Sequence, residues 1–278
     1  MPHPNLIQQK LNAKANNLRQ VDFIYQEIAK RMTERLNYIK LTPHQILDIG
    51  SGLNLDADLL KQKYPKSSLY KVDFAINLLK KSKSTSRVMD RLFKLNSELI
   101  CADALNLPIL SQSMDLVWSD LVLPYITDLN GYFKEIRRVL KLGGSFLVTG
   151  LGVDSLWQLR EVGLNTYNFP DMHIIGDILV RLGFSNPVTD IEYITLEYDN
   201  FRQLLADIRL IGCGALSQKN SYLTKSDYIH LEQSFAKLIQ KDKLPLTLEI
   251  FYAHAWKDKI ELDLPQDTKL VQFHKSGN

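Results

Sequence analysis

Short apolar stretches alternate with amphipathic stretches through residues 45–151. Strands buried in a parallel sheet are short apolar runs, whereas an amphipathic helix repeats its apolar residues every three or four positions. The predicted strands are 46–49, 68–75, 98–104, 114–120 and 145–151, and the predicted helices are 55–64, 76–94 and 129–140. This alternation predicts an α/β fold with a mostly parallel sheet and helices on both of its faces.

The flanking segments complete a domain that we place at residues 21–257. A helix is predicted over 21–38, where Ile24, Ile28, Met32 and Leu36 recur at helical spacing. Beyond residue 151 we predict helices at 154–163 and 172–184, one or two strands over 187–198, a helical insertion around 200–241 and a last strand at 245–257. Residues 1–20 are interpreted as a flexible arm and 258–278 as a tail.

Acidic residues and glycines lie at the ends of the first four predicted strands. Asp48 and the turn Gly50-Ser51-Gly52 end the first strand, and Asp73 ends the second. Asp103 and the pair Ser119-Asp120 follow the third and fourth. Ligands of open α/β sheets bind beyond the carboxyl ends of the strands, so these residues predict one binding site.

The residue types at this site suit an adenosine with a small polar tail. A glycine turn lets the backbone approach a ligand closely, and the following helix offers free N–H groups. The Asp73 carboxylate can accept hydrogen bonds from a ribose diol, and Asp103 can accept from the adenine amine.

Two ligand classes share that adenosine. A dinucleotide requires G-x-G-x-x-G, but the sequence from Gly50 is G-S-G-L-N-L, with Leu55 at the position of the third glycine. S-adenosylmethionine carries no phosphate and tolerates a looser turn, so it is the better candidate.

The segments "ILDIGSG", "KVDFA" and "CADALNLPILSQSMDLVWSD" resemble the class I S-adenosylmethionine-dependent methyltransferases. The segments "GVDSLWQLREVG", "DMHIIGDILVRLGF" and "LPLTLEIFYAHAWK" resemble the malonyl-acyl-carrier-protein O-methyltransferases of biotin synthesis. The similarity runs from about residue 20 to 257. It implies a Rossmann-like fold with a seven-stranded sheet, S-adenosylmethionine as cofactor, no metal, and methylation of the free carboxylate of a malonyl group on acyl carrier protein.

The same resemblance implies the functional residues. Arg160 is expected to bind the malonyl carboxylate and His254 to line the pocket with Trp256. Tyr125 is also expected to take part in catalysis, although Pro124-Tyr125 replaces the "QW" that the family has after the fourth strand. The expected cofactor contacts are Asp48, Gly50, Gly52, Asp73, Phe74, Asp103, Ala104, Ser119, Asp120 and Leu121.

The chain departs from the family pattern at several positions. Leu53 and Asn54 stand where a threonine and a glycine are usual, and Leu18 stands where the family has a lid tyrosine. Asparagine accepts left-handed backbone conformations more readily than most residues, so Asn54 is expected to replace the glycine in part. Two alternatives stay open: a degenerate methyltransferase fold that serves as an assembly scaffold, and a methyltransferase that acts on a protein side chain.

Composition and charge further limit the ligands and the cellular location that we expect. A net charge of +3 and a pI near 8.6 do not indicate a nucleic-acid binder. Two cysteines far apart suggest a reducing compartment, and no run of about 18 apolar residues is present. We therefore expect a cytoplasmic monomer without membrane contact. An acidic carrier protein would dock on a basic patch, either within 80–94 or at Arg137, Arg138 and Lys141.

Overall fold

A single seven-stranded sheet runs through the computed structural model, which describes residues 4–82, 97–164, 166–211, 224–239 and 242–258. The order across the sheet is β3-β2-β1-β4-β5-β7-β6, with β1 to β5 parallel, β7 antiparallel to β5, and β6 antiparallel to β7. The predicted mostly parallel seven-stranded sheet is thereby confirmed. The strands are β1 (Gln45–Ile49), β2 (Ser68–Asp73), β3 (Ser97–Cys101), β4 (Met114–Ser119), β5 (Leu140–Leu151), β6 (Ser185–Tyr198) and β7 (Leu244–Lys257).

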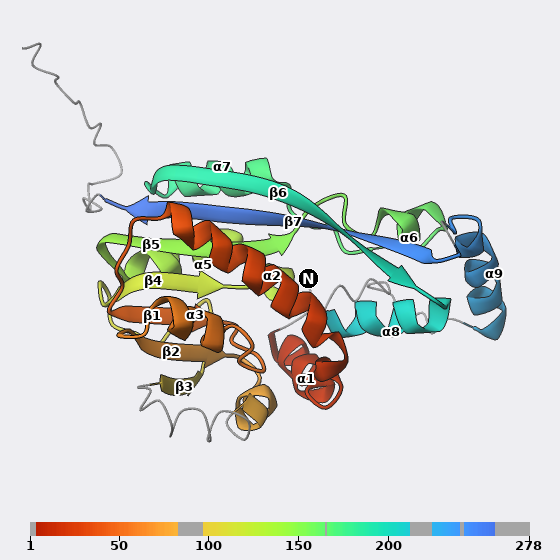
Figure 1. The fold of residues 1–278 in the computed structure, drawn as a ribbon, viewed down its shortest axis with the longest axis horizontal. Helices are drawn as coiled ribbons and strands as arrows, with labels where there is room; N and C mark the ends of the chain where they lie inside the picture. The colour runs from red at the N-terminus through yellow and green to blue at the C-terminus, as the bar shows by residue number, and fades with distance from the viewer. Residues whose placement is uncertain (1–3, 83–96, 165, 212–223, 240–241, 259–278) are drawn as a thin grey trace, which may run out of the picture.

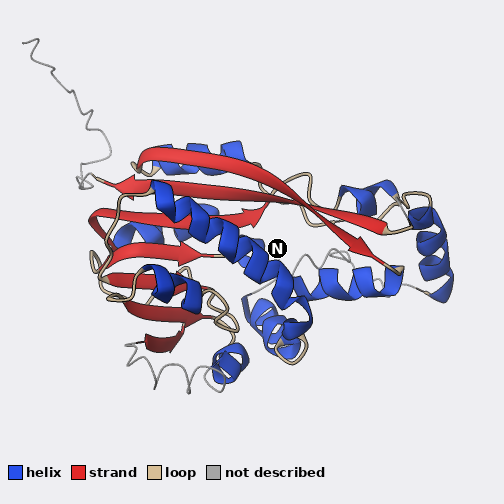
Figure 2. Cartoon of the chain, viewed as in Figure 1, coloured by secondary structure: helices blue, strands red, loops and turns tan. Residues whose placement is uncertain are grey.

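Helices cover both faces of the sheet (Figures 1 and 2). The α-helices are α1 (Pro4–Lys14), α2 (Asp22–Arg35), α3 (Ala57–Lys63), α5 (Leu129–Val139), α6 (Trp157–Glu161), α7 (Met172–Arg181), α8 (Phe201–Ile211) and α9 (Lys225–Ala236). Residues 76–82 are also helical. Three short 3-10 helices are η1 (Leu18–Val21), η2 (Leu36–Tyr38) and η3 (Leu123–Tyr125).

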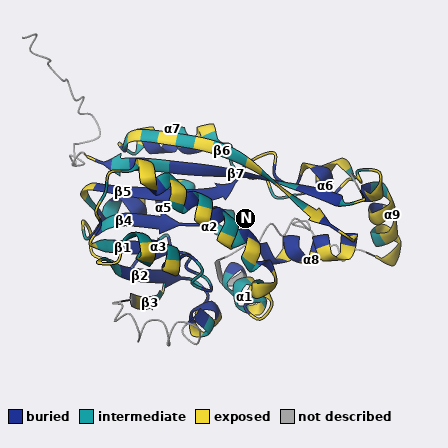
Figure 3. Cartoon of the chain, in the orientation of Figure 1, coloured by how far each residue is buried: buried dark blue, intermediate teal, exposed yellow. Residues whose placement is uncertain are grey.

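Two apolar cores separate these layers. One core lies between the sheet and helices α2 and α3, and it continues to α8. The other lies between the sheet and helices α5 and α7. The inner strands β1, β4, β5 and β7 are mostly dark in Figure 3, as expected for strands that are buried on both faces, whereas the edge strand β6 is largely intermediate or exposed.

Helix α5 illustrates how the sequence produces a core-facing helix. Its N-cap, Asp128, accepts a hydrogen bond from the N–H of Gly131 and so satisfies a donor of the first turn. Tyr132, Phe133, Ile136 and Val139 recur at helical spacing and are buried.

Three segments differ from the sequence expectations. The helix predicted over 129–140 ends at Val139, and the strand predicted over 145–151 begins five residues earlier, at Leu140. Gly143, with a φ of +74°, lies within that strand. The one or two strands predicted over 187–198 are a single strand, β6, which begins at Ser185. Residues 4–14, interpreted as part of an arm, form helix α1.

The far ends of β6 and β7 project beyond the rest of the sheet and carry α6, α8 and α9 (Figure 1). Helices α8 and α9 occupy the region of the predicted helical insertion, and the predicted tail at 258–278 lies outside the described residues apart from residue 258. Within the part of the chain that is described, no helix is long and apolar enough to cross a lipid bilayer.

Candidate cofactor and substrate pocket

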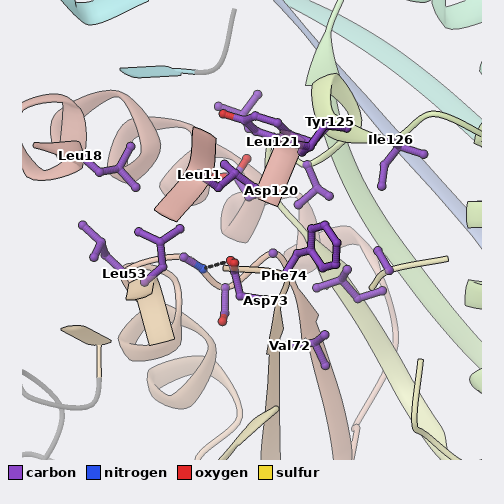
Figure 4. A pocket seen from close by; sticks show the side chains of 18 of the residues that line it. Leu11, Leu18, Leu53, Val72, Asp73, Phe74, Asp120, Leu121, Tyr125 and Ile126 are labelled. Atoms are coloured by element: carbon purple, nitrogen blue, oxygen red, sulfur yellow. Dashed lines mark hydrogen bonds between the residues drawn. The ribbon is translucent and has the colours of Figure 1, made fainter. Parts of the chain in front are cut away.

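A pocket lies beyond the carboxyl ends of β1, β2 and β4, and residues of α1 and of the end of α8 also line it; Figure 4 shows part of this lining. Most of the residues predicted from strand ends line it together, although they come from separate strands. These lining residues are Gly50, Gly52, Asp73, Phe74, Asp103, Ala104, Asp120, Leu121 and Tyr125.

The loop after β1 has the backbone that glycine permits. Gly50 and Gly52 have φ values of +78° and +49°, and Asn54 has a φ of +68°. The prediction that Asn54 adopts a left-handed conformation in place of a glycine is therefore confirmed. A Cβ atom on Gly50 would come within 2.0 Å of Val122 Cγ2, so no larger residue fits there.

Asp73 joins this loop to the end of β2. Its Oδ2 accepts a hydrogen bond from the N–H of Gly52 at 2.8 Å, and its Oδ1 accepts from the N–H of Ala75 at 2.7 Å. Burial raises the pKa of Asp73 to about 6, although these two hydrogen bonds lower it. Each carboxylate oxygen keeps a second lone pair, which a diol could use.

Three more buried carboxyls meet near Asp73. Burial raises the pKa of Asp56 to about 6, and raises the pKa values of Asp48 and Asp120 well above the usual range, with a further increase from the neighbouring Asp56. Asp120 accepts a hydrogen bond from Thr149 Oγ1, but its Oδ2 is buried with no partner among the described residues. We call Gly50, Gly52, Asp56, Asp73 and Asp120 the pocket floor.

Asp56 is a site residue that sequence reasoning missed. It precedes helix α3, where an aspartate usually caps the first turn, but its side chain makes no capping hydrogen bond. Instead Oδ2 accepts a hydrogen bond from Trp118 Nε1 at 2.6 Å. Only the position of Asp56, directly after the glycine loop, could have indicated a role in the site.

Two expected cofactor contacts lie behind the pocket floor and do not line the pocket. Asp48 is fully buried within β1. The Ser119 hydroxyl donates to the Ile49 carbonyl at 3.0 Å and accepts from the Tyr132 hydroxyl at 2.7 Å. Both residues therefore support the floor from below.

The two leucines that depart from the family pattern pack in the same small cluster. Leu53 is buried with Ala15, Ala75 and Leu78, and Leu18 packs against them. Gln8 Nε2 of α1 also donates to the Phe74 carbonyl at 2.9 Å. The bulk of Leu53 thus anchors the N-terminal segment over the floor, which explains how the altered loop is accommodated.

Arg160 does not line this pocket. Its guanidinium donates to the carbonyls of Ser155 at 2.7 Å and Val153 at 2.9 Å, and to Thr166 Oγ1 at 3.2 Å. These bonds tie α6 to the loop after β5.

His254 also lies outside the pocket, near the C-terminal end of β7 and opposite Leu147 of β5. Its ring stands edge-on to Trp256 at a centroid distance of 5.6 Å, and burial lowers its pKa to about 4. The structure therefore brings neither Arg160 nor His254 to the floor.

In one of the two expected basic patches, the side chains are buried or interact with other residues of the protein. Arg137 is buried, Arg138 forms an ion pair with Glu135 and donates to two carbonyls, and Lys141 forms an ion pair with Asp115. A patch at these three residues is therefore a poor docking surface. The other patch lies mostly outside the described residues, which stop at Ser82 and resume at Ser97.

The pocket suits a cationic ligand at its floor. Three carboxyls converge there, one with a buried oxygen that lacks a partner, and the only cationic side chain among the described lining residues is Lys14. A buried carboxylate is stabilised by an ammonium or sulfonium group. No group of three or more potential metal ligands is found in the residues that are described.

Comparison with known proteins agrees with this geometry. Residues 47–148 match a family described as a methyltransferase domain. Among solved structures, the YcgJ protein from Bacillus has a TM-score of 0.61 at 13% identity, covering 82% of this chain and 98% of that one. A phosphoethanolamine N-methyltransferase from Haemonchus contortus has a TM-score of 0.59 at 18% identity, covering 91% and 60%. At such identities the likeness concerns the fold alone.

Similarity to curated proteins is much stronger. A malonyl-[acyl-carrier protein] O-methyltransferase from Gallionella capsiferriformans is 40% identical over 84% of this chain and 84% of its own length. A protein of the same name from a Methylovorus species is 37% identical over 90% and 88%. The chain therefore belongs to the malonyl-[acyl-carrier protein] O-methyltransferase family.

Proposed function

We propose that this protein transfers a methyl group from S-adenosylmethionine to the free carboxylate of a malonyl group on acyl carrier protein. The observation that carries the proposal is the acidic pocket floor at the ends of three parallel strands, in a chain whose relatives bear the name of this reaction. S-adenosylmethionine has two cationic groups, an ammonium and a sulfonium, and both suit such a floor.

Different residues of the pocket would bind different parts of the cofactor. Asp73 would hold the ribose hydroxyls, and Asp103 and Ala104 would border the adenine. Asp120 and Asp56 would face the ammonium, because both line the pocket and Asp120 Oδ2 has no partner among the described residues. Bound there, S-adenosylmethionine would supply a methyl group attached to a positively charged sulfur.

The chain itself has little proton chemistry to perform. A malonyl carboxylate is ionised at pH 7, so it can attack the methyl carbon without a general base. A new C–O bond forms, the C–S bond breaks, and its electron pair stays on the sulfur. The protein's tasks are to align the two reactants and to exclude water. Ile7, Leu11 and Leu18 cover the pocket from the N-terminal side and serve the second task.

The carrier protein would approach the side of the pocket formed by α1, η1 and α8. Lys10, Arg19 and Arg209 are exposed on these three elements, which frame the pocket mouth. An acidic carrier is attracted to such cations by long-range electrostatics. We propose a cytoplasmic monomer as the acting form.

Incubation with S-adenosylmethionine and malonyl carrier protein tests the proposal. We expect the carrier to gain the mass of one CH2 unit, and alkaline hydrolysis to remove it as methanol, because an ester has formed. High salt should slow the reaction with the carrier but not with a small malonyl thioester. Failure to bind S-adenosylmethionine in calorimetry would favour the scaffold alternative. Methylation of another protein, with an unchanged malonyl carrier, would favour a side-chain methyltransferase.

A further inference from the structure

Two tyrosine hydroxyls converge on one carbonyl oxygen at the mouth of the pocket. Tyr25 of α2 and Tyr125 of η3 both donate to the Ile211 carbonyl, at 3.4 Å and 3.3 Å. Ile211 ends helix α8, where the last carbonyls have no partner within the helix. Hydroxyl hydrogen bonds are usually near 2.7–2.8 Å, so both bonds are long and weak.

The same tyrosines line the pocket, and they lie on the same side of it because both hydroxyls meet at the Ile211 carbonyl. Figure 4 shows Tyr125 above Asp120, with Asp73 further below. The Lys14 ammonium is 5.9 Å from the centroid of the Tyr125 ring, and Lys14 is the only cationic residue among the described lining residues. We call Lys14, Tyr25 and Tyr125 the pocket rim. The pocket is thus polarised, with carboxyls on the floor and hydrogen-bond donors on the rim.

From this geometry we propose that Tyr25 and Tyr125, with Lys14 beside them, bind the substrate's carboxylate. The Ile211 carbonyl occupies the position of one carboxylate oxygen in the free protein. The inference rests on the proposed function, since it names the residues that hold the group to be methylated. Two donors directed at one oxygen form a site for an anion, and a carboxylate makes shorter and stronger hydrogen bonds than a neutral carbonyl.

The choice of phenols also has a consequence for the reaction. A bidentate arginine would pair both oxygens of the carboxylate that must act as nucleophile, whereas two neutral hydroxyls orient it and only the Lys14 ammonium beside them adds a positive charge. Methyl transfer removes the negative charge, so the ester is a weaker acceptor. The tyrosines can then return to the Ile211 carbonyl, which favours release of the product over the substrate.

Substitution of the two hydroxyls tests this role. We would compare Tyr25→Phe, Tyr125→Phe, the double variant and Lys14→Met with Tyr38→Phe, a control whose side chain is 89% exposed on η2. Each lost hydroxyl should raise the KM for malonyl carrier protein about tenfold, as expected for a hydrogen bond to a charged group. The Kd for S-adenosylmethionine should stay within about twofold of wild type, because that ligand is held by the floor.

Binding of the methyl ester separates this proposal from a purely structural role. The double variant should lose affinity for the malonyl carrier but not for its methyl ester. If the tyrosines only fasten α8, the melting temperature and both carrier affinities should fall together, and the proposal is overturned. It is also overturned if the KM stays within twofold. A wild-type protein that binds malonyl carrier but does not methylate it would contradict the proposed function alone, and calorimetry with the same variants would still decide the role of the tyrosines.

Discussion

The floor and the rim of the pocket differ in charge and in origin. The floor contains three carboxyls from a stretch of fewer than 75 residues, each near the end of a parallel strand. The rim contains two phenols and an ammonium from α1, α2 and η3, and its tyrosines hold the end of α8. The floor suits a cation and the rim suits an anion. A reaction between a sulfonium and a carboxylate needs both in one pocket, which explains why the two surfaces face each other.

The largest expected effect comes from breaking the floor at Gly50. In Gly50→Ala, the new Cβ would stand 2.0 Å from Val122 Cγ2, at a φ of +78°. Left-handed backbone alone costs about 1–2 kcal/mol for a residue with a side chain, and the clash must be relieved by moving the loop. We expect S-adenosylmethionine affinity, measured by calorimetry, to fall more than about 30-fold.

Gly143→Ala is the matched control for this loss. Gly143 has a similar φ of +74°, but a Cβ atom there would meet nothing within 4 Å. This variant should lose some stability and keep its cofactor affinity. Equal affinity losses in the two variants would mean that the close packing of the glycine loop does not matter to the floor. If Gly50→Ala also keeps an affinity for the malonyl carrier near that of wild type, the floor binds the cofactor and the rim binds the carrier independently.

Acid should weaken the floor by a smaller factor. Asp56 and Asp73 have pKa values raised to about 6 by burial, and a bound cation favours their ionised forms. The carboxylate of this pair that would face the ammonium is Asp56, so affinity for S-adenosylmethionine should rise by about tenfold between pH 5 and pH 7 as Asp56 ionises. In Asp56→Asn the slope should be shallower. Asp58→Asn, at an exposed position on α3, should leave the slope unchanged.

Stability of the free protein should change with pH in the opposite direction. Since the folded-state pKa values of these carboxyls exceed the ordinary value of 3.8, the folded protein holds their protons more tightly than the unfolded chain does. The contribution of these groups to stability is therefore largest below about pH 4 and decreases until about pH 6. The increase in melting temperature on adding S-adenosylmethionine should be greater at pH 7.5 than at pH 5.5. An increase that is constant across this range would contradict an ionised floor.

The smallest expected effect is at Leu53, where the floor meets the N-terminal segment. Leu53→Thr removes packing against Ala15 and Leu78 and should lower the free energy of unfolding by about 1–2 kcal/mol. Faster proteolysis within residues 1–20 should accompany it. Cofactor affinity should fall by less than about threefold. Leu110→Thr, at a residue that is 81% exposed, is the control. A clear gain in cofactor affinity would instead mean that Leu53 obstructs the floor.

The floor was largely predictable because strand ends can be read from the sequence. Asp73, Asp103 and Asp120 each follow an apolar strand, and parallel strands bring such ends together whatever their separation. Asn54 was predictable because few residues accept its backbone conformation. Asp56 was missed because its role depends on Trp118, which is 62 residues away along the chain.

The rim was hardly predictable. Arg160 and His254 were expected in the pocket from family resemblance, but Arg160 donates to the loop after β5 and His254 packs against Trp256 near the end of β7. Tyr125 was expected, while Tyr25 was treated as one residue of an amphipathic helix. Helix α1 was interpreted as part of an arm because its composition is polar, and Leu11 finds its apolar partners at Leu53, Ala75 and Leu78, far along the chain.

The sequence by itself determined the sheet, its coverage by helices and the acidic character of the cofactor site. These features depend on local periodicity and on strand ends, which every parallel α/β fold uses in the same way. Tertiary structure decided which side chains oppose that site, since Lys14, Tyr25, Tyr125 and Ile211 meet only when α1, α2, η3 and α8 pack together. Contacts between elements so far apart depend on packing of the whole domain, and no short stretch of sequence records them.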